Sequence, residues 1–175
     1  KLYGEFLGLP GRLKGGLMTD ETEDLKKKRF EVRELIMLQK ITGSWDCTDM
    51  LRLAMSVFGG HGVMEDFSTL PRLYRDAAIN ELWEGPRNVL LTQMHRDFQR
   101  VSSWYKPSEF VRNILGRTGE GVAAKLGAEM DELVAYPNLF GMDDTTFEVC
   151  RRLDAFCHDL FHAYQDSALS DVDKE

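Results

Sequence analysis

The spacing of apolar residues along this chain is that of α-helices almost throughout. Sustained alternation of apolar and polar residues is lacking, and no Asn-Gly or Asp-Gly pair marks a hairpin turn. The first long helix is predicted to begin near Thr22 and to continue past Gly43 as far as Val57. The glycine-rich stretch 58–62 should end it, because glycine favours turns with positive φ. In its second half, the positions expected to face inward are Leu51, Ala54 and Met55.

The same pattern predicts further helices after the glycine-rich stretch. They are expected at 71–76 after a Ser68 cap, at 86–103 and 107–119 with a proline first, at 121–135, and at 145–167. Thr145 and Glu148 have the spacing of a capping box at the start of the last helix. Its inward face would hold Phe147, Cys150, Leu153, Phe156, Cys157, Leu160 and Phe161. The fold class is therefore predicted to be all-α, an up-and-down helical bundle with extra helices at its C-terminal end.

Glycine content and charge divide the chain into four stretches. These are an irregular N-terminal segment 1–21, a helical domain 22–104, an additional acidic helical region 105–170 and a frayed tail 171–175. Residues 106–175 hold 7 basic and 14 acidic residues, so their sum of −7 equals the net charge of all 175 residues. Because nucleic-acid binding needs clustered cations, no nucleic-acid partner is expected. The first residue is Lys1 rather than Met, so the chain is expected to be part of a longer protein.

Other features of the sequence argue against a membrane span, a disulfide framework and a metal site. No apolar run approaches the roughly 18 residues that would suggest a membrane span. The three widely spaced cysteines do not form a disulfide framework, which favours a reducing, cytoplasmic location. His158 and His162 lie four residues apart, with Asp154 one turn earlier, and this spacing could bind a metal. Because no third strong ligand is evident, no metal is expected.

The stretch 54–91 carries the most specific pattern in the chain. It contains Phe58-Gly59-Gly60-x-Gly62, then Leu73-Tyr74-Arg75-Asp76, then Trp83-Glu84-Gly85 followed by a helix. In order and spacing, these motifs resemble the C-terminal helical domain of the acyl-CoA dehydrogenase family. The variant with Leu-Tyr-Arg and Trp-Glu-Gly is most similar to the branch that includes the bacterial adaptive-response flavoprotein. The resemblance covers residues 24–104 and implies that 22–104 forms a bundle of this type.

The resemblance also implies the roles of individual residues. Glu84 would be the base that removes the α-proton of an acyl-CoA thioester, while a hydride passes from the β-carbon to N5 of FAD. Gly85 would let the substrate approach the backbone closely. Contacts with FAD are implied for Ser56, Gly59, Gly60, Gly62, Pro86, Arg87 and Asn88, with the glycine turn reaching the cofactor of a neighbouring subunit. Ser56 and Pro86 depart from the family, which often has Gln and a hydroxyl residue there.

The residues alone leave simpler interpretations open. Glu84 could be an acidic residue before a helix, stabilised by the helix dipole, and the glycine turn could be a simple helix stop.

The function that the resemblance implies is the C-terminal domain of an FAD-dependent acyl-CoA dehydrogenase, as a fragment inactive alone. The implied partners are an acyl-CoA substrate, further copies of the chain in a dimer or tetramer, and an electron-transfer flavoprotein. One alternative is a flavoprotein of the same family with a DNA-associated protective role, for which a basic tail would be expected. The other is a helical oligomerisation module without catalysis.

Overall fold

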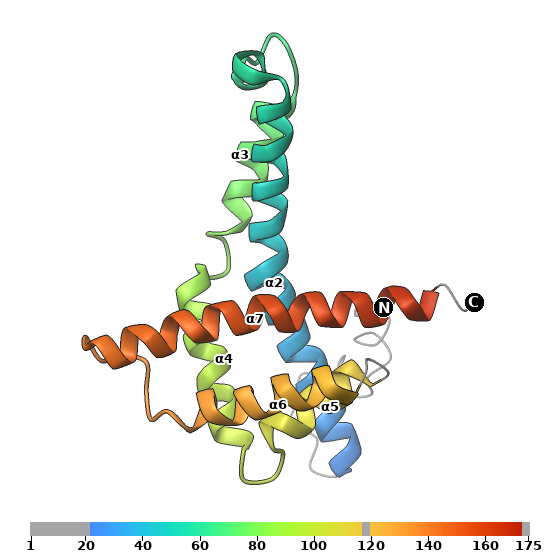
Figure 1. Cartoon of the computed structure of the whole chain (residues 1–175), viewed down its shortest axis with the longest axis vertical. Helices are drawn as coiled ribbons and strands as arrows, with labels where there is room; N and C mark the ends of the chain where they lie inside the picture. Colours follow the sequence, from blue (N-terminus) through green and yellow to red (C-terminus); the bar gives the residue numbers. More distant parts are fainter. Residues whose placement is uncertain (1–21, 117–119, 173–175) are drawn as a thin grey trace, which may run out of the picture.

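The computed structural model describes residues 22–116 and 120–172, and within these ranges it contains helices and no strand (Figure 1). The predicted all-α class is therefore confirmed for this part of the chain. The predicted irregular segment 1–21 and the last residues of the predicted frayed tail, 173–175, lie outside the described residues. The elements are α2 (Glu23–Val57), the 3-10 helix η2 (Gly59–Val63), α3 (Leu70–Asn80), α4 (Arg87–Val101), α5 (Pro107–Leu115), α6 (Glu120–Ala135) and α7 (Asp144–Val172).

Helix α2 runs the full height of the molecule without a break. The side chain of Thr22 accepts a hydrogen bond from the Leu25 amide at 3.3 Å, so the predicted start near this residue is confirmed. The helix passes through Gly43 and ends at Val57, as predicted. Gly59 follows with a φ of 55°, a conformation that glycine adopts at little cost.

The hydrophobic core surrounds only the first half of α2. Its buried residues come from α2, α4, α5, α6 and α7 and from the connection before α5. No residue between Ile41 and Leu91 belongs to this core. An aromatic cluster at its centre packs edge to face, with ring centroids 4.8 Å apart for Phe98 and Phe110 and 5.0 Å for Phe30 and Phe98. Helix α7 lies across α2 and α4 on this body (Figure 1). The acidic region 105–170 and the first half of α2 thus share one hydrophobic core. The domain boundary predicted at residue 104 stays a prediction.

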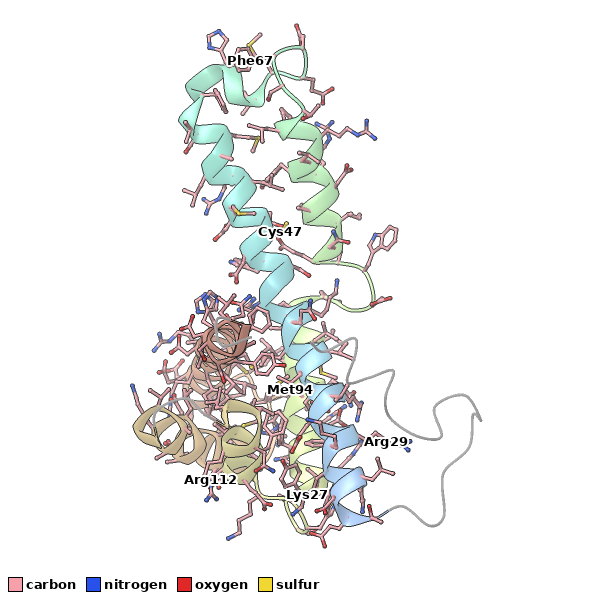
Figure 2. The ribbon with its side chains drawn as sticks, turned by 90° about the vertical axis from the view of Figure 1, so that its right-hand side faces the viewer. Lys27, Arg29, Cys47, Phe67, Met94 and Arg112 are labelled. Atoms are coloured by element: carbon pink, nitrogen blue, oxygen red, sulfur yellow. The ribbon has the colours of Figure 1, made fainter. Side chains whose placement is uncertain are left out.

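Residues 47–83 project from this body and are called the finger below (Figures 1 and 2). It consists of the second half of α2, η2 at the tip and α3 running back beside α2, with Phe67 near the tip (Figure 2). The three predicted inward positions of α2 in the finger are only half-buried, because α3 covers one side of the helix and the core does not extend there.

Two helices differ from the pattern-based prediction, α3 mainly in its end and α7 in its cap. Helix α3 begins at Leu70 and is several residues longer than 71–76. The predicted capping box of Thr145 and Glu148 is wrong. The Asp143 carboxylate accepts hydrogen bonds from the Thr146 amide at 2.9 Å and from its hydroxyl at 2.8 Å. Glu148 instead pairs with Arg151.

The inward face predicted for α7 is correct in its middle and wrong at its start. Leu153, Phe156, Cys157, Leu160 and Phe161 are buried, and Cys150 is half-buried. Phe147 is exposed instead, because the first turn of α7 extends beyond the helices on which the rest of α7 packs.

Buried polar side chains join α2 to the helices around it. Asp97 on α4 accepts a hydrogen bond from Arg33 at 2.6 Å. Glu31 accepts one from the Tyr105 hydroxyl, also at 2.6 Å, and one from Asn113 at 3.2 Å. Because Asp97 and Glu31 have these polar partners, the cost of burying their carboxylates is offset.

Glu34 is the exception among these carboxylates. Its side chain is fully buried, and neither carboxylate oxygen has a hydrogen-bond partner among the described residues. Its ion-pair partner, Nη1 of Arg33, lies 3.7 Å from Oε1. Burial raises the pKa of Glu34 to about 8, opposed by the charge of Arg33 and assisted by that of Asp97. The carboxyl is therefore largely protonated at neutral pH.

None of the described helices combines the length and the apolar character that a membrane crossing requires.

Candidate functional site

Glu84 and Gly85 lie in the turn 81–86 that joins the finger to α4. Glu84 has a φ of 60° and is the only non-glycine residue with positive φ in the described ranges, and Gly85 follows with a φ of 114°. A left-handed conformation costs a residue with a side chain about 1–2 kcal/mol. The Glu84 side chain is exposed and gains no burial that would offset this cost. Strained residues of this kind cluster at functional sites, where the surroundings hold them in place.

The start of α4 follows directly. Pro86 occupies the cap position with φ −67° and ψ 158°, and α4 begins at Arg87. No side chain caps this end, because the proline side chain carries no hydrogen-bond acceptor. The first backbone amides of a helix point along its axis with a partial positive charge, so an uncapped end can bind an anionic group.

Pro86, Arg87 and Asn88 are brought together at an open hollow of about 450 Å³. Its other lining residues come from the end of the finger, from α4 and from α7, namely Glu81, Leu82, Leu91, Cys150, Arg151 and Asp154. A second hollow of about 470 Å³ adjoins it along α4 and shares three of its lining residues. Three of the predicted cofactor residues thus lie at one place, whereas Glu84 and Gly85 do not line either hollow.

The Arg87 side chain is engaged within the chain. Its guanidinium pairs with the carboxylate of Asp154 on α7, donates to the carbonyl of Ile41 at 2.6 Å and lies 5.1 Å from the Trp45 ring centroid. Two of the three guanidinium nitrogens of Arg87 are therefore already hydrogen-bonded within the chain. Asp154 is likewise committed, so it does not serve the two histidines of α7 as the sequence spacing suggested.

The glycine turn, residues 58–62, lies near the tip of the finger, at the opposite end of α3 from the turn 81–86. A Cβ on Gly62 would lie 1.9 Å from the Met55 carbonyl oxygen, so packing requires a glycine there. A Cβ on Gly60 would meet no atom within 4 Å, and φ does not require glycine there either. The Ser56 hydroxyl donates to the Leu53 carbonyl at 2.6 Å. Contacts within the described residues thus explain Gly62 but not Gly60.

The structure does not bring the glycine turn and Glu84 together. Helix α3 separates them, and its 11 residues span about 17 Å. Glu84 is also exposed, whereas a base for a weakly acidic C–H group is expected in a dry pocket. The proposed roles of all these residues stay predictions.

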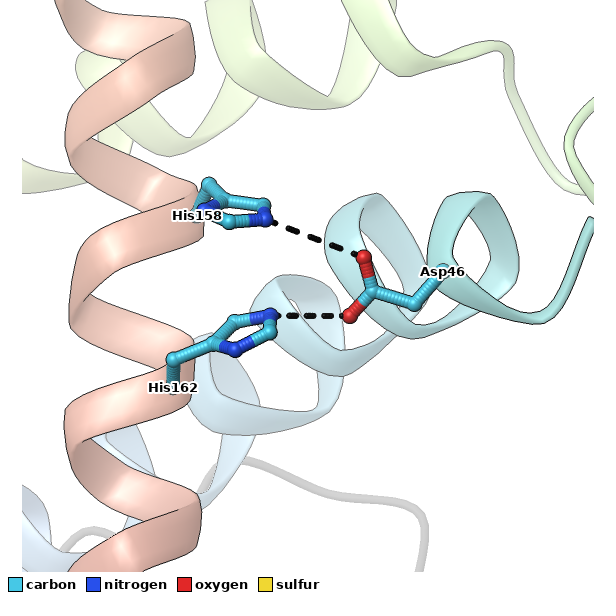
Figure 3. Close-up of side chains that lie close together, drawn as sticks. All are labelled: Asp46, His158 and His162. Atoms are coloured by element: carbon cyan, nitrogen blue, oxygen red, sulfur yellow. Dashed lines mark hydrogen bonds and ion pairs between the residues drawn. The ribbon is translucent and has the colours of Figure 1, made fainter. Parts of the chain in front are cut away.

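Two features were not found from the sequence. Asp46 lies beside His158 and His162 (Figure 3), and no sequence signal could identify it because it is 116 residues from His162. The second feature is the apolar surface of the finger. Of the 19 exposed large hydrophobic side chains in the described ranges, 11 lie within residues 50–83.

Comparison with known proteins identifies relatives of the first part of the chain. Residues 17–98 match the family model for the acyl-CoA dehydrogenase C-terminal domain. The chain is 40% identical over 52 residues to AidB of Escherichia coli (strain K12), which is provisionally named an acyl-CoA dehydrogenase. That alignment covers 30% of this chain and 9% of AidB. It is 36% identical over 67 residues to acyl-CoA dehydrogenase family member 11 of Caenorhabditis elegans, covering 38% of this chain and 11% of that protein.

No solved structure matches the chain. The matched part of the chain spans about a tenth of the length of each curated relative.

Proposed function

Because residues 17–98 match the family model for the acyl-CoA dehydrogenase C-terminal domain, we propose that this chain contributes that domain to an FAD-dependent acyl-CoA dehydrogenase. The observation that carries the proposal is the turn 81–86. Its exposed Glu84 is held at a φ of 60° and is followed by a glycine at 114°. A chain that needed only a connection between two helices would gain stability from glycine or asparagine at this position.

In the proposed reaction, Glu84 accepts the α-proton of an acyl-CoA thioester. When bound, FAD would accept at its N5 atom the hydride that leaves the β-carbon of the acyl group. Gly85 is proposed to let the thioester approach the backbone beside the base. Its φ of 114° and the Leu90 side chain, 3.3 Å from the position of an added Cβ, also favour glycine there. The uncapped amides at the start of α4 and the open surface at Gly60 can hold the negatively charged parts of the cofactor.

The proposed site is shared with other parts of the complete protein. Glu84 is exposed in this chain, and a carboxylate abstracts a weakly acidic proton efficiently only where water is excluded. The glycine turn, at the far end of α3, is proposed to contact the cofactor of a neighbouring subunit. The chain alone is therefore proposed to be inactive. Electrons are proposed to leave to an electron-transfer flavoprotein, in a reducing cytoplasmic compartment suited to three free thiols.

The full gene product tests this proposal through its mass, its visible spectrum and its response to acyl-CoA. We expect a mass well above the 20.1 kDa of this chain, an oxidised-flavin spectrum, and bleaching of that spectrum by acyl-CoA without oxygen. A flavin that acyl-CoA does not bleach would favour the DNA-associated flavoprotein. A full-length product without flavin would favour the oligomerisation module.

A second candidate function, self-assembly, is favoured by the apolar surface of the finger. The exposed hydrophobic side chains within residues 50–83 are Met50, Leu53, Val57, Phe58, Val63, Met64, Phe67, Leu73, Ile79, Leu82 and Trp83. A concentration of apolar side chains on one projection marks a surface that another protein covers. We propose that further copies of the chain cover it, in a dimer or a dimer of dimers, since twofold pairing is the commonest symmetry.

Placing a charge on this surface should dissociate the assembly. We expect Phe67→Glu combined with Leu53→Glu to yield monomers, because each change leaves a carboxylate in an apolar contact. Light scattering coupled to size exclusion gives the mass at several concentrations. Met142→Glu is the matched control, because Met142 is 93% exposed but lies outside the finger. A parent chain that stays monomeric at high concentration while remaining helical would contradict self-assembly through the finger.

A further inference from the structure

Three side chains from two helices meet where the finger leaves the body (Figure 3). His158 and His162 lie one turn apart on α7, with stacked rings whose centroids are 4.2 Å apart. Both Nε2 atoms point to the carboxylate of Asp46 on α2, at 2.9 Å for His162 and 3.8 Å for His158. One ligand atom from each residue falls within 4.8 Å of the other two.

We propose that Asp46, His158 and His162 form a binding site for a divalent transition-metal ion of the zinc class. A tetrahedral ion with bonds of about 2.1 Å needs ligand atoms about 3.4 Å apart. The two nitrogen–oxygen distances lie on either side of this value, and all three ligand atoms lie within 4.8 Å of one another, so rotation of the side chains would be needed to complete the site. Two imidazoles and one carboxylate from a rigid helix pair are the donors that zinc and its neighbours prefer, whereas magnesium and calcium need oxygen ligands.

Solvent can reach the site to complete the coordination. The histidine side chains are each 45% exposed and that of Asp46 is 33% exposed. Three protein ligands leave at least one position for water or for a small anion. The hydrogen bond between His162 Nε2 and the Asp46 carboxylate already brings two of the ligands together, and a bound ion would take the place of its proton, which is released to solvent.

Because the site joins α7 to α2, a bound ion would stabilise the contact between these two helices. Asp154 lies one turn before His158 on the same face of α7 and pairs with Arg87, which also contacts the Ile41 carbonyl of α2. The ion would add a second link between α7 and α2, just where α2 leaves the core. It would therefore hold the acidic C-terminal helix against the helix that carries the finger. This effect is independent of flavin or acyl-CoA.

The test uses the 175-residue chain without an affinity tag. Titration calorimetry with ZnCl2 should show one ion per chain, and zinc should raise the thermal midpoint of unfolding whereas MgCl2 should not. His158→Ala, His162→Ala and Asp46→Ala should each weaken zinc binding by about tenfold or more, because each removes one of three ligands. His61→Ala and Cys47→Ser are matched controls, since both residues are exposed and neither belongs to the site.

The Asp46→Ala variant separates this site from a simpler one. Two histidines one turn apart can chelate a metal by themselves, and binding that is unchanged in Asp46→Ala would overturn the proposed three-ligand site. Binding that is lost in Cys47→Ser, or the lack of a one-to-one complex in the parent chain, would overturn it as well. None of these results depends on whether the complete protein dehydrogenates acyl-CoA.

Discussion

Glu84→Gln in the complete enzyme is expected to lower turnover of acyl-CoA by about 10²–10⁴-fold, the usual contribution of a positioned base. Glutamine has nearly the same shape as glutamate but cannot accept the α-proton. The flavin content and the helical structure should not change, because Glu84 is exposed and makes no contact on which the fold depends. The measurements are anaerobic flavin reduction by acyl-CoA in a stopped-flow instrument and the ratio of flavin to protein.

Glu23→Gln is the control for this variant. Glu23 is exposed in the first turn of α2 and lines neither hollow. This variant should retain the parent rate. If Glu84→Gln also retained the parent rate, the base would lie elsewhere in the protein, and the strained turn would need another explanation.

A second large effect is expected from the buried Glu34 as the pH changes. Its pKa is raised by burial to about 8 in the folded chain from an ordinary value of 4.5, so the folded chain binds a proton that the unfolded chain releases between these values. The stability that this proton confers is fully present below about pH 4.5 and is lost as the pH rises to about 8. A shift of this size corresponds to about 3–5 kcal/mol in the free energy of unfolding.

Glu34→Gln should remove this pH dependence. The variant and the parent chain should have similar stability near pH 5, and the variant should be more stable near pH 8.5, because an amide does not ionise. Urea denaturation at both pH values gives the difference, from which titrations common to both chains cancel. Glu148→Gln is the control, since that carboxylate is exposed and should show no comparable effect. An equal difference between parent and variant at both pH values would mean that Glu34 is hydrated or paired in solution.

The helices could be predicted from sequence because their signals are local. The Thr22 cap, the glycines after Val57 and Pro107 at the start of α5 each act on neighbouring residues, and the helices begin or end there. The burial of α2 could not be predicted in the same way. Its apolar spacing continues from one half to the other, but α4 to α7 cover only the first half. Which part of an amphipathic helix is covered depends on the path of distant segments, and periodicity carries no information about that path.

The candidate site was predictable only in part for the same reason. The motif residues Gly59, Gly60, Gly62, Glu84 and Gly85 were identified by their order, and two of the most unusual backbone angles are at Glu84 and Gly85. Sequence reasoning placed Arg87 at a cofactor, but the guanidinium pairs with α7, a contact between residues 67 positions apart. The partner of the histidine pair was missed because Asp46 has no local feature that distinguishes it from other surface carboxylates.

The 11 residues of α3 fix both the distance between the glycine turn and the turn 81–86 and the angle between them about the helix axis. An α-helix advances about 1.5 Å and turns about 100° with each residue. One residue inserted into or deleted from α3 would therefore rotate the turn 81–86 by more than a quarter of a circle relative to the glycine turn. We therefore expect related chains to keep the number of residues in α3, and to place any insertion in the loop before this helix or in the turn after it.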